Sequence, residues 1–191
     1  MKKLLVIIAI IVGLILVVAL VIFGWAQKTY NNIVTMDETV NGTWAQVENV
    51  LQRRYDLIPN LVETVKGYAS HEREVLTQIT EARSRVGSAG TPQQRMTAEG
   101  ELSGALARLL VVVENYPNLK ANQNFIMLQD QLEGTENRIA VERGRYNDAV
   151  MIFNQYIRRF PASLLAGMFN FEKRAFFEAP GEAKEAPKVK F

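Results

Sequence analysis

The feature that most constrains this chain is an apolar run, Leu4 to Trp25, of 22 residues without one charged side chain. At about 1.5 Å per residue, a helix of this length reaches roughly 33 Å, enough to cross a hydrocarbon core of about 30 Å. A single segment can satisfy its own backbone hydrogen bonds in lipid only as a helix. The run therefore predicts one N-terminal transmembrane helix, and we assign residues 1–29 to this anchor.

The two ends of the run favour an uncleaved anchor over a removable secretory signal. A signal peptide has a shorter apolar core of about 7–15 residues, followed by small residues at a cleavage site, whereas this run ends in bulky Phe23 and Trp25. Lys2 and Lys3 precede the run, and Lys28 is the only basic residue that closely follows it. This asymmetry predicts a single-pass protein of the cytoplasmic membrane, with its N-terminus inside and its body outside the cytoplasm.

The rest of the chain is electrically balanced. The chain has 22 basic and 20 acidic residues, and leaving out Lys2 and Lys3 gives 20 of each over residues 26–191. Surfaces that bind nucleic acid need clustered basic residues facing phosphates, but the longest basic runs here are only pairs, such as Arg53-Arg54 and Arg158-Arg159. The composition argues against a nucleic-acid partner, and the lack of cysteine excludes disulfides and thiol chemistry.

The body has the pattern of long helices. Apolar residues recur mostly three or four positions apart through residues 30–56 and 57–86, and no stretch alternates with period two. Pro59 is expected to kink or break the chain between these helices, because proline lacks the N–H group. A loop is predicted at 87–90, and Thr91, Pro92 and Gln94 have the residue types of a capped helix start.

The helix that begins at Thr91 should end before Pro117. Its interior carries a run of small residues, Gly100 to Ala105, with glycine at 100 and 104. Glycine costs about 1 kcal/mol inside a helix. The run therefore predicts the close approach of a neighbouring helix as compensation.

Residues 121–160 carry the clearest pattern, an alternation of three- and four-residue steps sustained for five heptads. Short loops at 87–90 and 117–120 favour antiparallel neighbours. We therefore predict an all-α fold, in which residues 30–177 form an elongated antiparallel bundle of three or four helices after the single transmembrane helix. Residues 178–191 are small, charged and proline-bearing, which is typical of a disordered tail. The members of the seam are Phe125, Leu128, Leu132, Thr135, Ile139, Glu142, Tyr146, Ala149, Phe153, Tyr156 and Phe160.

Two stretches of the body resemble the LemA family. One runs from Glu114 to Phe125 (ENYPNLKANQNF) and continues with Glu136-Asn137-Arg138-Ile139-Ala140, and the other is Arg54 to Val62 (RYDLIPNLV). The resemblance covers nearly the whole chain, and its motifs are specific in combination. It implies a bacterial single-span membrane protein with a helical antiparallel bundle, associated with envelope proteases and stress. It supplies no catalytic residue.

Polar residues on the seam need partners. Thr135 and Glu142 are expected to pair with polar residues across the bundle and so to set its register. The alternative is a polar groove that binds a peptide or a partner helix. The candidate members of this network are Arg54, Asn60, Glu72, Arg143 and Asn147.

No constellation for catalysis or metal binding is present. His71 and Glu72 are adjacent in the sequence, and adjacent side chains on a helix diverge by about 100°. A zinc site needs three or four ligands, and the carboxylates Glu133, Glu136 and Glu142 lack the Glu-x-x-His partner of di-iron bundles. We predict no catalytic residue, no metal, no cofactor and no small-molecule substrate.

The segment 164–177 is rich in phenylalanine. It is expected to form a short helix that folds back over the end of the bundle. The alternative is an exposed apolar patch, flanked by Lys173 and Arg174, that contacts a membrane surface or a partner subunit.

Three functional hypotheses remain open from the sequence. The first is a non-catalytic, membrane-tethered scaffold or interaction protein, which would self-assemble or bind unknown protein partners. The second, which rests on the resemblance, is an adaptor or regulator of a membrane protease or an envelope-stress pathway. The third, a hydrolase built on His71, has the least support.

Overall fold

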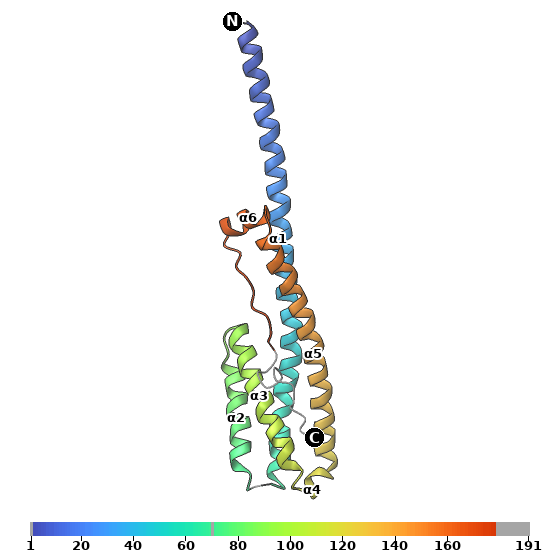
Figure 1. The fold of residues 1–191 in the computed structure, drawn as a ribbon. Helices are drawn as coiled ribbons and strands as arrows, with labels where there is room; N and C mark the ends of the chain where they lie inside the picture. Colours follow the sequence, from blue (N-terminus) through green and yellow to red (C-terminus); the bar gives the residue numbers. More distant parts are fainter. Residues whose placement is uncertain (1, 70, 179–191) are drawn as a thin grey trace, which may run out of the picture. The chain divides into compact units, whose positions relative to one another are not determined.

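The computed structural model describes residues 2–69 and 71–178, and within these ranges every regular element is a helix (Figure 1). The helices are α1 (Lys2–Lys66), α2 (Arg73–Ser88), α3 (Pro92–Val113), α4 (Pro117–Lys120), α5 (Gln123–Arg158) and α6 (Ala162–Met168). This confirms the all-α fold class. The tail predicted at 178–191 lies outside the described residues, apart from Glu178.

The chain divides into two compact units. The anchor unit contains the chain as far as Gly42 together with Asp148–Arg174, and the bundle unit contains Thr43–Asn147 together with the chain from Ala175 onward. Helices α1 and α5 each contribute residues to both units.

In the anchor unit, the apolar run of α1 is bare. The structure contains one helix long and apolar enough to cross a membrane among the described residues, and none of its apolar window is buried. Burial on α1 begins at Thr29, which is 5% exposed, and Ile33, which is fully buried. Within the same unit Arg174 binds Asp37 through two guanidinium nitrogens, at 2.9–3.0 Å. The candidate membrane span therefore ends where tertiary packing begins.

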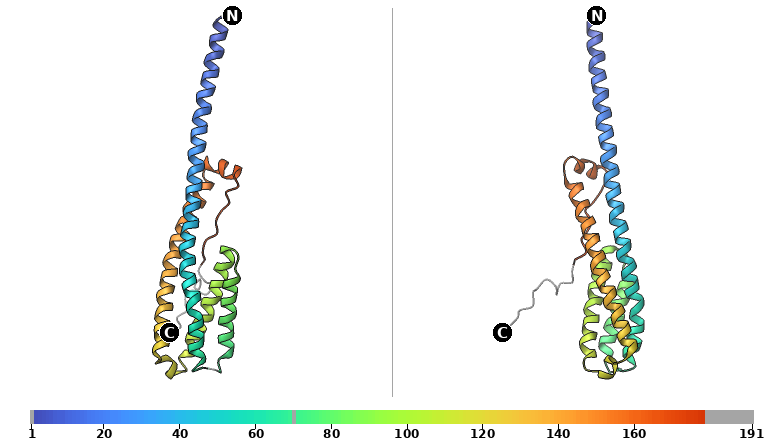
Figure 2. Two further views of the ribbon diagram at one scale, coloured as in Figure 1. Left: turned by 180° about the vertical axis from the view of Figure 1, so that it is seen from behind. Right: turned by 90° about the vertical axis from the view of Figure 1, so that its right-hand side faces the viewer.

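The bundle unit packs the second part of α1 with α2, α3 and the first part of α5. Consecutive helices run in opposite directions, and short turns join them (Figures 1 and 2). The turn between α1 and α2 lies within residues 67–72, and α4 lies in the connection between α3 and α5. Large, fully buried side chains from each of the four helices form the core, among them Ile58, Leu61, Ile79, Leu102, Leu109 and Phe125.

Pro59 does not break the helix, so of the kink or break that was predicted, the break is wrong. A proline removes one N–H group, which leaves the carbonyl four residues earlier without its helical partner. That carbonyl belongs to Tyr55, and Arg83 of α2 donates its Nε–H to it at 3.1 Å. The Arg83 guanidinium also lies 3.8 Å from the centre of the Tyr55 ring. A neighbouring helix thus supplies the hydrogen bond that the proline takes away.

The helix predicted over 57–86 is wrong as a single element. The chain turns at 67–72, between α1 and α2. The pattern hid this turn because Ala69 within it is buried at the spacing that a continuing helix would use. The expected loop at 117–120 is also wrong, because these residues form the single turn α4 with Pro117 in its first position.

The start of α3 confirms the capping prediction. Gln94 donates its backbone N–H to the Thr91 hydroxyl at 3.2 Å, and Pro92 is the first helical residue. The side chain of Gln94 accepts the backbone N–H of Gly90 at 3.1 Å. This completes the reciprocal pattern one residue earlier than the usual capping box.

The seam of α5 follows the prediction at its start and shifts by one residue at its end. Thr135, Ile139 and Tyr146 are buried as expected, but Val150 and Ile157 are buried in place of Ala149 and Tyr156. A straight helix drifts by about 20° per heptad from a strict seven-residue repeat. Over the length of α5 this drift amounts to about one position.

Candidate functional site

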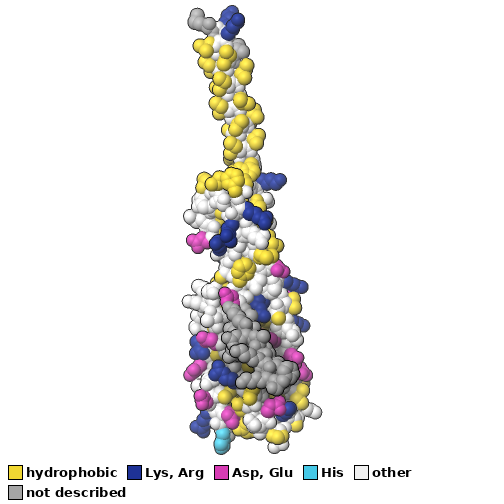
Figure 3. All heavy atoms as spheres, viewed as in Figure 1, with side chains coloured by type: hydrophobic (Ala, Val, Ile, Leu, Met, Phe, Trp, Pro, Cys, Tyr) yellow, Lys and Arg dark blue, Asp and Glu magenta, His cyan; other side chains and the backbone are white. Residues whose placement is uncertain are grey.

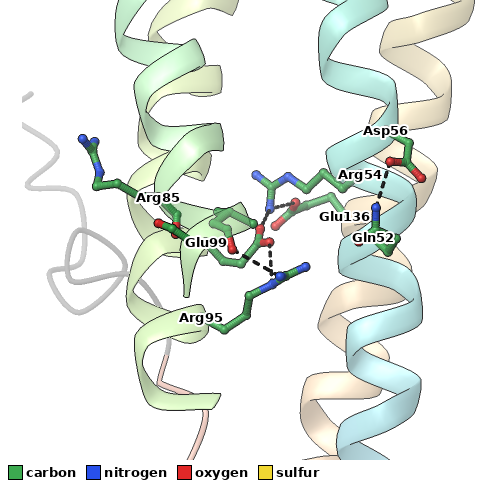
Figure 4. Close-up of polar contacts among 9 residues, drawn as sticks. Gln52, Arg54, Asp56, Arg85, Arg95, Glu99 and Glu136 are labelled. Atoms are coloured by element: carbon green, nitrogen blue, oxygen red, sulfur yellow. Dashed lines mark hydrogen bonds and ion pairs between the residues drawn. The ribbon is translucent and has the colours of Figure 1, made fainter. Parts of the chain in front are cut away.

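A buried polar network lies in the bundle unit, centred on Arg54 of α1 (Figure 4). Arg54 is 4% exposed, since it occupies a position on the core face of α1 between Leu51 and Ile58. Its Nη1 atom lies 3.1 Å from Glu136 Oε2 and 3.6 Å from Glu99 Oε2. Its Nη2 atom donates to the Ser103 hydroxyl at 2.8 Å. One guanidinium therefore links α1, α3 and α5.

Glu99 is the least satisfied member of this network. It is 3% exposed, and neither carboxylate oxygen accepts a hydrogen bond from the described residues. Its second cation, Arg95 Nε, is 3.9 Å from Glu99 Oε1 and also makes no hydrogen bond there. Burial raises the pKa of Glu99 from 4.5 to about 7; Arg54 and Arg95 oppose the rise and Glu136 adds to it. Desolvation therefore outweighs the attraction of the two arginines.

A groove of about 990 Å³ opens beside this network. Glu99 and Arg54 line it, together with Gly100 and Gly104 of α3. We call it the Glu99 groove. A Cβ atom built on Gly100 would meet no atom within 4 Å, and one on Gly104 would meet only the end of Arg108, at 3.9 Å. The predicted close approach of a helix is therefore wrong for these two glycines, which border open space, whereas Ala105 of the same run is buried in the core.

A second, smaller groove of about 340 Å³ also borders the network. Arg54, Ser103 and Glu136 line both grooves, and apolar residues supply most of the remaining lining of the smaller one, among them Leu61, Leu106, Leu110, Phe125 and Leu132. The polar network thus borders both a mixed groove and an apolar one.

The two seam residues expected to pair across the bundle do not do so. Thr135 is 2% exposed and donates its hydroxyl to the carbonyl of Gln131, on its own helix, at 2.7 Å. Glu142 accepts from Arg145, three residues further along, at 2.7 Å. Because both find partners within α5, they do not set the register, and the prediction is wrong for them.

The other residues predicted for the network have separate roles. Glu72 accepts the Tyr116 hydroxyl at 2.7 Å, and this hydrogen bond raises the pKa of Tyr116. Asn147 fixes the chain after α6, since its amide exchanges two hydrogen bonds with the backbone of Phe177, at 2.8 and 3.0 Å. The Arg143 guanidinium lies 5.7 Å from the Phe177 ring centre. Asn60 is exposed, and its backbone carbonyl accepts the hydroxyl of Thr64 within α1.

His71 and Glu72 lie in the turn before α2 and not on a helix. His71 is exposed. Throughout the described ranges, no three His, Cys, Asp or Glu side chains gather closely enough to hold a metal ion.

Sequence reasoning missed Glu99 and Ser103, although one signal was available. Glu99 lies three residues after Met96 and three before Leu102, both of which are buried. A carboxylate at a position on the apolar face of an amphipathic helix predicts a buried charge. The partner could not be inferred, because Arg54 lies 45 residues away and is one of 22 basic residues.

Comparison with known proteins identifies the family. The model of the LemA family matches residues 43–191. Magnetosome protein MamQ 2 of Paramagnetospirillum magneticum is 27% identical over 175 residues, which cover 78% of this chain and 64% of that protein. MamQ of Magnetospirillum gryphiswaldense is 25% identical over 174 residues, with the same coverage.

Protein LemA of Metamycoplasma hominis is 21% identical over 150 residues, which cover 78% of this chain and 68% of that protein. The chain thus spans just under two thirds of the length of the magnetosome proteins that it matches. Since the family model covers most of the chain, including every residue of the Glu99 groove, this protein belongs to the LemA family.

Proposed function

We propose that this LemA family protein is a non-catalytic, membrane-anchored interaction module whose Glu99 groove binds a segment of another protein chain, either a second copy or a different protein. The observation that carries the proposal is that two neighbouring residues of α3 at this groove each destabilise the protein alone. Gly100 weakens α3 without a packing contact in return, and Glu99 is buried without a hydrogen bond. Both costs would be offset by a ligand that fills the space and donates to the carboxylate.

A binding role fits Glu99 better than a catalytic role. A general base must lie within hydrogen-bond reach of the proton that it removes. Among the described residues no hydroxyl donates to Glu99, so no nucleophile is paired with it for activation. The nearby Ser103 hydroxyl accepts a hydrogen bond from Arg54.

The proposed setting is the cytoplasmic membrane. Residues 1–29 would anchor the chain, with the N-terminus in the cytoplasm and the helical body of residues 30–177 outside it. The lysines before the apolar run and the bare surface of that run support this arrangement.

The lack of cysteine makes a clean test available. A single cysteine placed at Gly104 would line the Glu99 groove, and one placed at Gly134 is a matched control. Like Gly104, Gly134 lies inside a helix; a Cβ there would meet nothing within 4 Å, and Gly134 lines neither groove. Native membranes that carry each variant are treated with a thiol-to-amine cross-linker and compared by immunoblotting.

We expect adducts of defined mass from the cysteine at 104 and none from the cysteine at 134. An adduct of twice the chain mass would identify a second copy as the occupant. Equal behaviour of the two variants would refute a binding role for the groove.

A membrane-impermeant maleimide applied to spheroplasts tests the orientation separately, since it labels position 134 only if the body is outside.

A further inference from the structure

A second surface lies in the anchor unit, beside the end of the apolar run. The Tyr30 ring of α1 packs against Phe169, just after α6, with ring centres 4.7 Å apart, and against Phe171 at 6.0 Å. Tyr30 is five residues beyond Trp25, or roughly 7.5 Å along the helix axis. The contact therefore holds α6 close to the point where the candidate membrane span ends.

The side of α6 that does not pack on its own unit is apolar. Ala162, Leu165 and Ala166 are buried, but four large apolar side chains in and around the helix are open to solvent. We call these four the α6 patch: Phe160 (81% exposed), Leu164 (58%), Met168 (73%) and Phe169 (51%). In Figure 3 the hydrophobic surface continues from the bare helix onto the adjoining end of the region below it.

The level of the patch matches the headgroup layer of a bilayer. This layer adds roughly 5–7 Å to each side of the hydrocarbon core. When the run Leu4 to Trp25 lies in the hydrocarbon core, Tyr30 and α6 lie within the headgroup layer or at its outer edge. Exposed basic residues nearby, Lys28, Arg158 and Arg159, suit the phosphates found there.

We propose that the α6 patch is a membrane-binding surface that enters the headgroup–acyl boundary of the same bilayer that α1 spans. This inference rests on the membrane anchoring given under the proposed function. Lipid is favoured over a protein partner because the patch is continuous with the bare helix, so any protein that covered it would have to displace headgroups. The protein would then meet the membrane at two places, a spanning helix and a short helix lying in the interface.

Depth-dependent quenching of tryptophan tests the proposal in the full chain. The native tryptophans are Trp25 and Trp44. Three single-tryptophan proteins share a Trp44→Phe background: one keeps Trp25, and the other two carry Trp25→Phe with either Leu164→Trp or Ile152→Trp. Leu164 and Ile152 are matched in exposure, at 58% and 53%. Ile152 lies eight residues before Phe160, roughly 12 Å further along α5.

Each protein is reconstituted into vesicles of phosphatidylcholine and phosphatidylglycerol, with or without brominated acyl chains. Circular dichroism confirms that all three keep the same helical content. We expect bromolipid to quench Trp25 and the tryptophan introduced at position 164 to a comparable extent. The tryptophan introduced at position 152 should keep its emission unchanged.

The other outcomes overturn the proposal in different ways. Quenching of Trp25 with none at position 164 would refute the α6 patch as a membrane surface while the anchor stands. If the emission from position 164 were blue-shifted without quenching, a protein surface and not lipid would cover it. Quenching at all three positions would mean that the body lies on the bilayer without selectivity. No quenching even of Trp25 would refute the anchor itself.

Discussion

The buried carboxylate of Glu99 makes the stability of the bundle depend on pH. In the unfolded chain Glu99 loses its proton near pH 4.5, and in the folded protein near pH 7. Between these values the folded state holds the extra proton, so raising the pH favours unfolding. The difference of about 2.5 pH units, at roughly 1.4 kcal/mol per unit, corresponds to about 3 kcal/mol.

The change that isolates this effect is Glu99→Gln, which keeps the shape of the side chain and removes the titration. Urea unfolding of the detergent-solubilised protein, followed by circular dichroism, gives the free energy of unfolding at each pH. We expect the wild-type value, measured relative to that of the variant, to fall by about 3 kcal/mol between pH 4.5 and pH 8. Below pH 4.5 the difference should level off, because both states are then protonated.

Glu101→Gln is the matched control. Glu101 lies two residues away on the same helix, but its side chain is 47% exposed and pairs with Arg85 at the surface. The difference in unfolding free energy between the Glu101→Gln variant and the wild type should stay nearly constant over the same pH range. If the free-energy difference between wild type and Glu99→Gln were also constant, the carboxylate would be solvated or hydrogen-bonded in solution. The argument that Glu99 lacks a hydrogen-bond donor in the groove would then fail.

The remaining predictions concern stability and use the same unfolding assay. Arg54→Met should cost about 3–5 kcal/mol at pH 8, because Glu99 is then buried without its main cation, and clearly less at pH 5; an equal cost at both values would contradict the charge argument. Gly100→Ala should raise stability by up to about 1 kcal/mol, since a Cβ there meets nothing within 4 Å; a loss would mean that the groove is closed in solution. Arg83→Met should cost about 1–3 kcal/mol because it leaves the Tyr55 carbonyl without a partner, whereas no cost would show that water replaces the arginine. Thr91→Ala should cost about 1 kcal/mol through the lost cap of α3, and Thr91→Ser should recover most of it.

The features that could be predicted from the sequence are those that depend on residues close together in the chain. The apolar run, the cap at Thr91 and the long helix that became α5 are all local patterns of spacing or residue type. The choice between a kink and a break at Pro59 could not be made from the sequence, because the compensating hydrogen bond comes from Arg83 in the next helix.

The site was harder to predict than the fold for the same reason. Arg54 was a candidate for a polar network, but its partners Glu99, Ser103 and Glu136 come from two other helices. The small residues of α3 were noticed and misread. Their spacing is the same whether a helix or open space lies opposite, and only the positions of the neighbouring helices distinguish the two cases.

The onset of burial at Thr29 has a practical consequence for handling the protein. Before that residue the described side chains of α1 are exposed, apart from the half-buried Ala26, so a version that begins at Gln27 would lose none of the buried residues described here. Such a trimmed protein should keep the Tyr30–Phe169 stack and the Asp37–Arg174 ion pair, and should dissolve without detergent more readily than the full chain. It would also keep the α6 patch exposed, so that the affinity of this apolar surface for lipid vesicles could be measured directly.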